Sequence, residues 1–234
     1  EPMLKFFNAL STLFTPAKYP SDSATEPAQI TQCKVLLIVY DPLMDPATGI
    51  TLSQKQNWYR TTDLITGFIL DMLQVSGGMA RFQIVQRVDV NEFPAKVDGF
   101  RYTPKTYLDV LQNKSAPHTP AEVDYNAILA KYNVLQRVAQ NEIDEVWVFG
   151  FPHAGFYEST MGGPGAFWCN APPMKNTESS KRRFVVMGFS YERHIGEMHE
   201  AYGHRAESIM EKTFGKLSGE ANLWQRFIRY EKVA

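Results

Sequence analysis

Residues 33–42 read Cys33-Lys34-Val35-Leu36-Leu37-Ile38-Val39-Tyr40-Asp41-Pro42, and they are the strongest indication of the fold class. From Val35 to Tyr40 every residue is aliphatic or aromatic, and Asp41-Pro42 ends the run. A strand that is apolar on both faces is typical of the middle of a parallel sheet that is covered by helices on both sides. The stretch therefore predicts a central parallel strand.

Further strands and helices alternate along the rest of the chain. The expected elements are a helix at 54–75, a strand at 82–88, a helix at 124–140, strands at 145–150 and 184–189, a helix from 194, and a last helix at 218–230. Strands that alternate with helices imply right-handed crossovers and a parallel sheet. We therefore predict an α/β fold, a three-layer sandwich with a mainly parallel sheet of at least four strands.

Length and composition indicate one globular domain. The chain has 234 residues, of which 44% are hydrophobic and 21% charged, and its formal net charge is −1. Without a basic surplus, nucleic acid is not an expected partner, and no apolar run is long enough to span a membrane. Residues 33–234 are predicted to form the domain, whereas residues 1–32 are expected to be an arm or linker, because 19–27 is rich in Pro, Ser and Thr. The oligomeric state is open.

The two cysteines, Cys33 and Cys169, fit two descriptions. One disulfide that ties the N-terminal arm to a Pro/Gly-rich loop is conceivable. The alternative is two unrelated free thiols.

The helix from 194 carries the densest group of titratable side chains. At 100° per residue its apolar side chains fall on one arc, and on nearly the opposite arc lie Glu197, Glu200, His204, Glu207 and Glu211. A solvated helix face usually interleaves both signs of charge, whereas this face repeats one sign around a histidine. A cation or a proton among these carboxylates would relieve their repulsion. A plain solvated face is the alternative.

The spacing of the histidines narrows the possible metal ligands. The zinc-peptidase signature His-Glu-x-x-His has its histidines at i,i+4, but His199 and His204 lie one residue further apart. On a regular helix they point about 140° apart, so both can bind one ion only if the helix carries a bulge. Glu200 and His204 do share a face. The candidate metal ligands are His204, His199, Glu207 and His153, with Glu200 and Glu197 as candidate catalytic carboxylates.

The loop at 151–168 follows the carboxyl end of the third strand, where open α/β sheets bind ligands. It combines glycines, aromatic residues and the titratable His153 and Glu158. We expect it to face the Glu200/His204 helix. The candidate substrate-binding residues are Gly155, Phe156, Tyr157, Glu158 and Trp168. The alternative is a surface loop whose aromatic side chains fill the top of the core.

Two resemblances extend these expectations. The stretch from Ile143 to Glu211 resembles zinc metallopeptidases of the IgA-peptidase type in its order of elements: a strand, a Gly-rich segment, and a helix with His-Glu and Gly-His. This resemblance implies a zinc ion and a peptide substrate. The chain is also similar to a group of secreted bacterial proteins of no known function, which implies an extracellular location. The segments that carry this similarity are 144–150, 155–159, 163–170, 196–198 and 203–208.

Three functions are compatible with these patterns. The first is a secreted metal-dependent hydrolase of metallopeptidase type, in which His204 helps to hold zinc and Glu200 or Glu197 deprotonates the bound water. The second is a metal-free glycosidase-like enzyme with Glu200 and Glu158 as an acid/base pair. The third is a non-catalytic surface or glycan-binding domain on a degenerate enzyme fold. The expected partner is thus a peptide or a polysaccharide.

Overall fold

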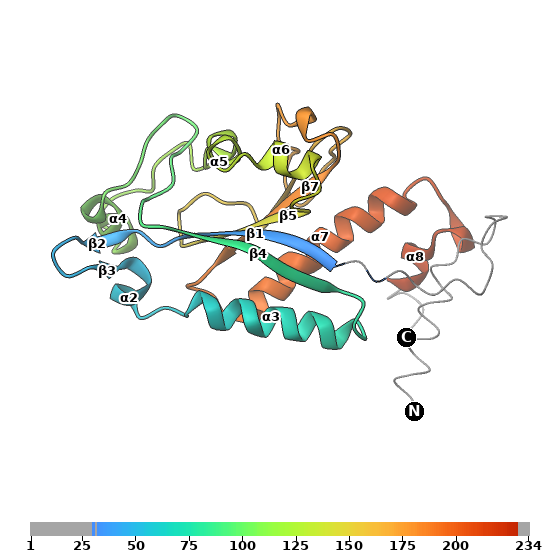
Figure 1. Cartoon of the computed structure of the whole chain (residues 1–234), viewed down its shortest axis with the longest axis horizontal. Coiled ribbons are helices and arrows are strands. Elements are labelled where there is room, and N and C mark those ends of the chain that lie inside the picture. Colours follow the sequence, from blue (N-terminus) through green and yellow to red (C-terminus); the bar gives the residue numbers. More distant parts are fainter. Residues whose placement is uncertain (1–29, 31, 229–234) are drawn as a thin grey trace.

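The structure is a computed structural model that describes residue 30 and residues 32–228 (Figure 1). Except for residues 30 and 32, the predicted N-terminal arm lies outside the described residues. No helix among the described residues combines the length and apolar content needed to cross a membrane.

Five strands form one sheet in the order β4-β1-β5-β7-β6. The central strand β1 (Gln32–Tyr40) pairs in parallel with β4 (Arg81–Val90) and β5 (Glu145–Gly150). β5 in turn pairs in parallel with β7 (Phe184–Ser190), and β6 (Ser159–Gly162) runs antiparallel to β7. The predicted α/β class and mainly parallel sheet are confirmed.

The strand predicted from 33–42 lies at the centre of the core. Every side chain from Val35 to Tyr40 is at most 4% exposed. β4, in contrast, lies at an edge of the sheet, and buried or half-buried residues alternate with exposed ones along much of its length. This difference follows from the sequence, because β1 is apolar on both faces and β4 is apolar on one.

Helices cover both faces of the sheet, as expected of a three-layer sandwich (Figure 1). α3 (Thr61–Val75) and α7 (Ile195–Phe214) cover one face, and α5 (Tyr125–Lys131) and α6 (Val134–Ala139) cover the other. On the α3 side, the ring of Phe68 lies 5.4 Å from Trp147 and 5.8 Å from Phe189. These aromatic contacts join α3 to β5 and β7.

Two of the predicted helices were wrong in extent, because each is divided by an asparagine. The helix expected at 54–75 is α2 (Leu52–Gln56) followed by α3, with Asn57 at φ 53° between them. The helix expected at 124–140 is α5 followed by α6, with Asn133 at φ 52° between them. A residue in the left-handed region cannot continue a right-handed helix, and asparagine adopts this region more readily than other non-glycine residues.

Short elements complete the fold. A small hairpin of β2 (Leu43–Asp45) and β3 (Ile50–Thr51) follows β1, and α4 (Pro104–Leu111) lies in the long β4–β5 connection. The last helix within the described residues is α8 (Leu223–Phe227), which is shorter than the helix predicted at 218–230. The sequence did not predict the hairpin or β6.

The order of the strands indicates which edge of the sheet is expected to bind a ligand. The chain moves from β1 to β4 on one side and then crosses to β5 on the other. In such sheets ligands bind outside the carboxyl ends of the strands. At that edge β5 leads into residues 151–158, and β7 leads into α7.

Candidate functional site

A pocket with a volume of about 480 Å³ opens at the carboxyl edge of the sheet. Its walls are residues 151–156 and Glu158 after β5, the end of β7, and the first two turns of α7. Both stretches that the sequence singled out therefore contribute to one cavity. The polar and charged residues that line it are His153, Glu158, Ser190, Glu192, Arg193 and Glu197.

Two glycines of the sheet allow residues 151–158 to lie directly on its surface. A Cβ atom at Gly150 would come within 2.8 Å of the ring of Phe156. A Cβ atom at Gly188 would collide with the carbonyl oxygen of Tyr157. The register pairs Val148 with Gly188, so both glycines lie on the same face of the sheet. The segment is thus held over β5 and β7 by close backbone approach.

Three carboxylates line the pocket, those of Glu158, Glu192 and Glu197, and two of them, Glu158 and Glu197, accept side-chain hydrogen bonds. Glu197, in the first turn of α7, accepts a 2.8 Å hydrogen bond from Arg193, and both side chains are about half exposed. Glu158, at the end of the loop, accepts a 2.7 Å hydrogen bond from the side-chain amide of Asn170. Both carboxylates are therefore oriented by a neighbour while solvent still reaches them.

His204 lies on the outer face of α7 among three glutamates. Its Nδ1 is 3.1 Å from Oε2 of Glu207, and its Nε2 is 3.8 Å from Oε1 of Glu200. The hydrogen bond with Glu207 raises the pKa of His204, and the charges of Glu158, Glu207 and Glu200 add to this effect. The loop carboxylate Glu158 is thus near this helix face, as expected from the sequence. Glu200, His204 and Glu207 do not line the pocket.

His199 points toward the other side of α7. Its Nε2 lies 3.0 Å from Oδ2 of Asp71 on α3, and its ring packs against Phe68 with centroids 5.1 Å apart. The two histidines of the helix therefore diverge, as their five-residue spacing predicts. His153 lines the pocket instead. Among the described residues, no three His, Cys, Asp or Glu side chains are arranged to hold a metal ion.

The predicted substrate-binding residues divide into two groups. Gly155, Phe156 and Glu158 line the pocket. Tyr157 instead donates a hydrogen bond to Glu122 and stacks on Tyr125 with ring centroids 6.2 Å apart. Trp168 lies outside the pocket lining, with 61% of its surface exposed.

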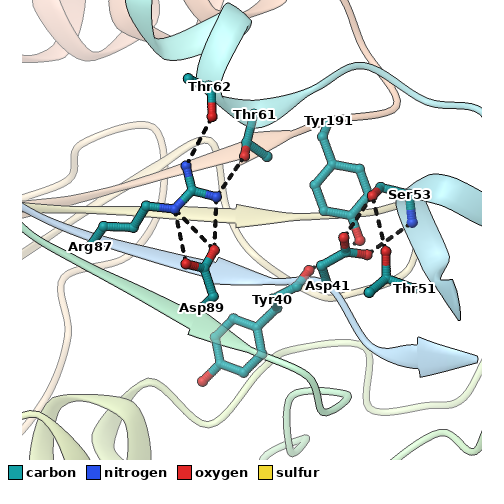
Figure 2. Close-up of polar contacts among 9 residues, drawn as sticks. All are labelled: Tyr40, Asp41, Thr51, Ser53, Thr61, Thr62, Arg87, Asp89 and Tyr191. Carbon is teal, nitrogen blue, oxygen red and sulfur yellow. Dashed lines mark hydrogen bonds and ion pairs between the residues drawn. The ribbon is translucent and has the colours of Figure 1, made fainter. Parts of the chain in front are cut away.

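Polar side chains at the carboxyl ends of β1 and β4 form two separate groups of hydrogen bonds, one around Asp41 and one around Arg87 (Figure 2). Asp41 accepts hydrogen bonds from the backbone N–H and the hydroxyl of Ser53, at 2.9 and 2.6 Å. Arg87 on β4 pairs with Asp89 at 2.8 Å and also donates to Thr61 and Thr62 at the start of α3. These contacts fix α2 and α3 to the sheet.

Both cysteines are free thiols. Cys33 is half-buried on β1, and Cys169 is completely buried behind the loop. Burial raises the pKa of both thiols. Neither side chain lines the pocket.

The sequence-based reasoning missed Ser190, Glu192 and Arg193 as pocket residues. The available signal was their position, because Ser190 ends β7 and Glu192 and Arg193 follow it at the carboxyl edge of the sheet. The preceding loop was identified by that same criterion.

Comparison of the sequence with models of protein families finds no match, and comparison with curated proteins finds none either. The two resemblances stay hypotheses. The pocket and the carboxylates around His204 are the features of the structure that indicate a function.

Proposed function

We propose that the protein is a hydrolase that binds its substrate in the pocket between residues 151–158 and the start of α7. Glu158 and Glu197 are its acid/base carboxylates. A single observation carries this proposal: two solvent-accessible carboxylates, one from the loop after β5 and one from α7, line the same 480 Å³ pocket at the carboxyl edge of the sheet.

The chemistry requires one carboxyl group that donates a proton to the leaving group and one carboxylate that activates water or attacks directly. Glu197 accepts a hydrogen bond from Arg193, and Glu158 accepts one from the side-chain amide of Asn170. Each carboxyl group is thus held in place by a neighbour, and we assign the two together as the acid/base pair.

The walls of the pocket suit a substrate with both apolar and polar groups. Phe151, Phe156 and Met198 contribute apolar surface, and Ser190 and Glu192 contribute polar groups. Peptides and polysaccharides both carry such groups, and we propose these two classes as the candidate substrates. The extracellular location stays a prediction, which fractionation of cells that express the protein would test.

The test compares the wild-type protein with Glu158→Gln and Glu197→Gln on a mixed peptide library and a panel of polysaccharides. New peptide termini are read by mass spectrometry, and new reducing ends by a colorimetric assay. We expect each substitution to lower turnover by about 10²–10⁴-fold, because general acid/base groups contribute that much. The matched control is Glu211→Gln, an exposed glutamate on the last turns of α7, which should leave turnover unchanged.

If both pocket variants hydrolyse at the wild-type rate, the acid/base assignment is wrong. If the wild-type protein binds a peptide or glycan without cleaving it, the molecule is a binding domain. The second outcome would support the non-catalytic alternative.

A metal-dependent hydrolase is the second candidate, and the surroundings of His204 favour it. The imidazole of His204 lies 3.1 Å from Glu207 and 3.8 Å from Glu200, and histidine and carboxylate are ligands that zinc accepts. The described residues do not bring three such ligands together, so a bound ion would require the side chains around His204 to rearrange. Elemental analysis of protein purified without an affinity metal would test this candidate. One zinc per chain that is lost in His204→Ala and kept in Glu197→Gln supports it, and no metal in the wild type removes it.

A further inference from the structure

Lys96, in the long connection between β4 and β5, is buried to 1% exposure although it carries an ammonium group. Its Nζ donates hydrogen bonds to three backbone carbonyls, those of Ala121 at 2.6 Å, His153 at 2.7 Å and Ala154 at 2.8 Å. The ring of Tyr102 lies 5.8 Å from the same nitrogen. An ammonium group has three donors, so all of them are used.

Two of these three carbonyls belong to residues that line the pocket, His153 and Ala154. The backbone there is unusual, because His153 has φ 63° and Gly155 has φ 95°. A non-glycine residue adopts the left-handed region only at a cost in free energy, which its surroundings must offset. Carbonyl oxygens that converge on one point also repel each other unless a positive charge lies between them.

Gly155 is fitted closely to the lysine. A Cβ atom at this position would lie 2.7 Å from Nζ of Lys96 and would collide with the carbonyl oxygen of Ala121. The backbone of Gly155 also accepts a 3.1 Å hydrogen bond from the N–H of Val123, the residue that forms a bridge with Lys96. The pocket wall and the 121–123 segment are therefore joined around one ammonium group.

We propose that Lys96 is the positioning residue of the pocket. Its ammonium group holds the carbonyl oxygens of His153 and Ala154 toward the buried Nζ and thereby sets the shape of the wall formed by residues 153–156. This inference rests on the proposed function only in treating the pocket as the ligand site. Lys96 does not line the pocket and acts through the backbone of the loop.

The geometry requires lysine and not merely a positive charge. The ammonium is a compact charge whose three donors match three converging carbonyls, whereas a guanidinium is planar and larger. Arginine at this position would have to push the loop outward. Lys96→Arg keeps the positive charge but is expected to loosen the loop as Lys96→Ala does. This variant therefore distinguishes the effect of the ammonium geometry from the effect of net charge.

The first experiment measures amide hydrogen exchange in the full chain for the wild type, Lys96→Ala and Lys96→Arg. In both variants we expect exchange at residues 151–158 to rise by about tenfold or more, while β1 stays protected, since local segments open independently of the core. The matched control is Lys105→Ala, which removes an exposed ammonium from the same connection and should leave exchange at 151–158 unchanged.

Chemical rescue tests whether the ammonium itself is needed. Lys96→Ala leaves three carbonyls around an empty space, and propylammonium can fill it with a chain and three N–H donors. We expect propylammonium to restore slow exchange at 151–158 in this variant, and tetramethylammonium, which has no N–H donor, not to restore it. Unchanged exchange in Lys96→Ala, or loosening that propylammonium does not reverse, overturns the proposal.

A measurement on the wild-type protein applies even if the variants do not fold. In ¹⁵N NMR spectra, the ammonium protons of Lys96 should exchange with water far more slowly than those of exposed Lys105, because all three are hydrogen-bonded. Equal exchange rates for the two lysines would contradict the proposal. None of these three experiments uses hydrolysis, so a loosened loop in a protein without hydrolase activity would refute the proposed function and leave the role of Lys96 intact.

Discussion

Arg205 of α7 and Glu145, the first residue of β5, form a buried ion pair in which Nη1 lies 2.5 Å from Oε2. The side chain of Glu145 is 2% exposed and that of Arg205 is 16% exposed. Glu145 also accepts a 2.8 Å hydrogen bond from Nε1 of Trp147. The helix that carries Glu197 and His204 is thus fixed to the amino edge of the sheet, while its first turns line the pocket at the opposite edge.

Removal of the arginine should strongly destabilise the fold. In Arg205→Met the carboxylate of Glu145 is left buried without a counter-charge, which costs about 3–5 kcal/mol when one partner of a buried pair is lost. Urea unfolding followed by circular dichroism measures the loss. The double variant Arg205→Met/Glu145→Gln should recover part of it, because glutamine is neutral and still accepts the bond from Trp147. A double variant as unstable as the sum of the two single variants would contradict this explanation.

Two glycines should respond in opposite directions to the same substitution. Gly155→Ala should lower the free energy of unfolding by more than about 1 kcal/mol, because φ 95° disfavours alanine and the new methyl group collides with the 121–123 segment. Gly203→Ala, on the exposed side of α7 with no atom near the new methyl group, should raise it by about 0.5–1 kcal/mol. Thermal unfolding of both variants checks the pair. Equal shifts would mean that the backbone at Gly155 is not constrained as described.

The thiols of Cys33 and Cys169 should be unreactive until the chain unfolds. Burial raises the pKa of both, so the reactive thiolate is scarce at neutral pH. Titration with a thiol reagent in the absence of reductant should show slow labelling of the native protein and two thiols per chain in denaturant. Absence of thiols in denaturant would instead show the disulfide that the sequence left open.

The four parallel strands of the sheet could be predicted from the sequence because their signals are local. The apolar run from Val35 to Tyr40 can only be a buried strand or helix segment, and Asp41-Pro42 ends it at the length of a strand. The divisions of the helices could not be predicted, because Asn57 and Asn133 are compatible with a helix until their left-handed backbone is seen.

The sequence predicted part of the candidate site, because the position of a loop after a strand is also a local signal. Residues 151–158 were identified because ligand sites of α/β folds lie at the carboxyl ends of strands. Lys96 gave no such signal, because an isolated lysine in an irregular segment is usually solvated. Its burial depends on carbonyls that lie 25, 57 and 58 residues away in the sequence, and such a convergence exists only in the folded chain.

The imidazole of His204 should titrate above the usual histidine value of about 6.5. The hydrogen bond to Glu207 is the main cause of the raised pKa, followed by the charges of Glu158, Glu207 and Glu200. Because the folded-state pKa is raised, protonated His204 favours the folded state. Its contribution to stability is fully present below pH 6.5 and is lost as the pH rises through the folded-state pKa.

NMR titration of the imidazole C–H signals measures this pKa directly. Glu207→Gln should lower it most, because that substitution removes both the ionic hydrogen-bond acceptor and a charge. Glu200→Gln and Glu158→Gln should lower it less, since each removes a charge without a hydrogen bond to the ring. Glu211→Gln, whose side chain is not among the causes of the shift, serves as the control and should leave it unchanged. A His204 that titrates at or below 6.5 in the wild type, or that does not respond to Glu207→Gln, would show that the three carboxylates do not act on this ring. The same result would remove the observation that favours a metal at this face of α7.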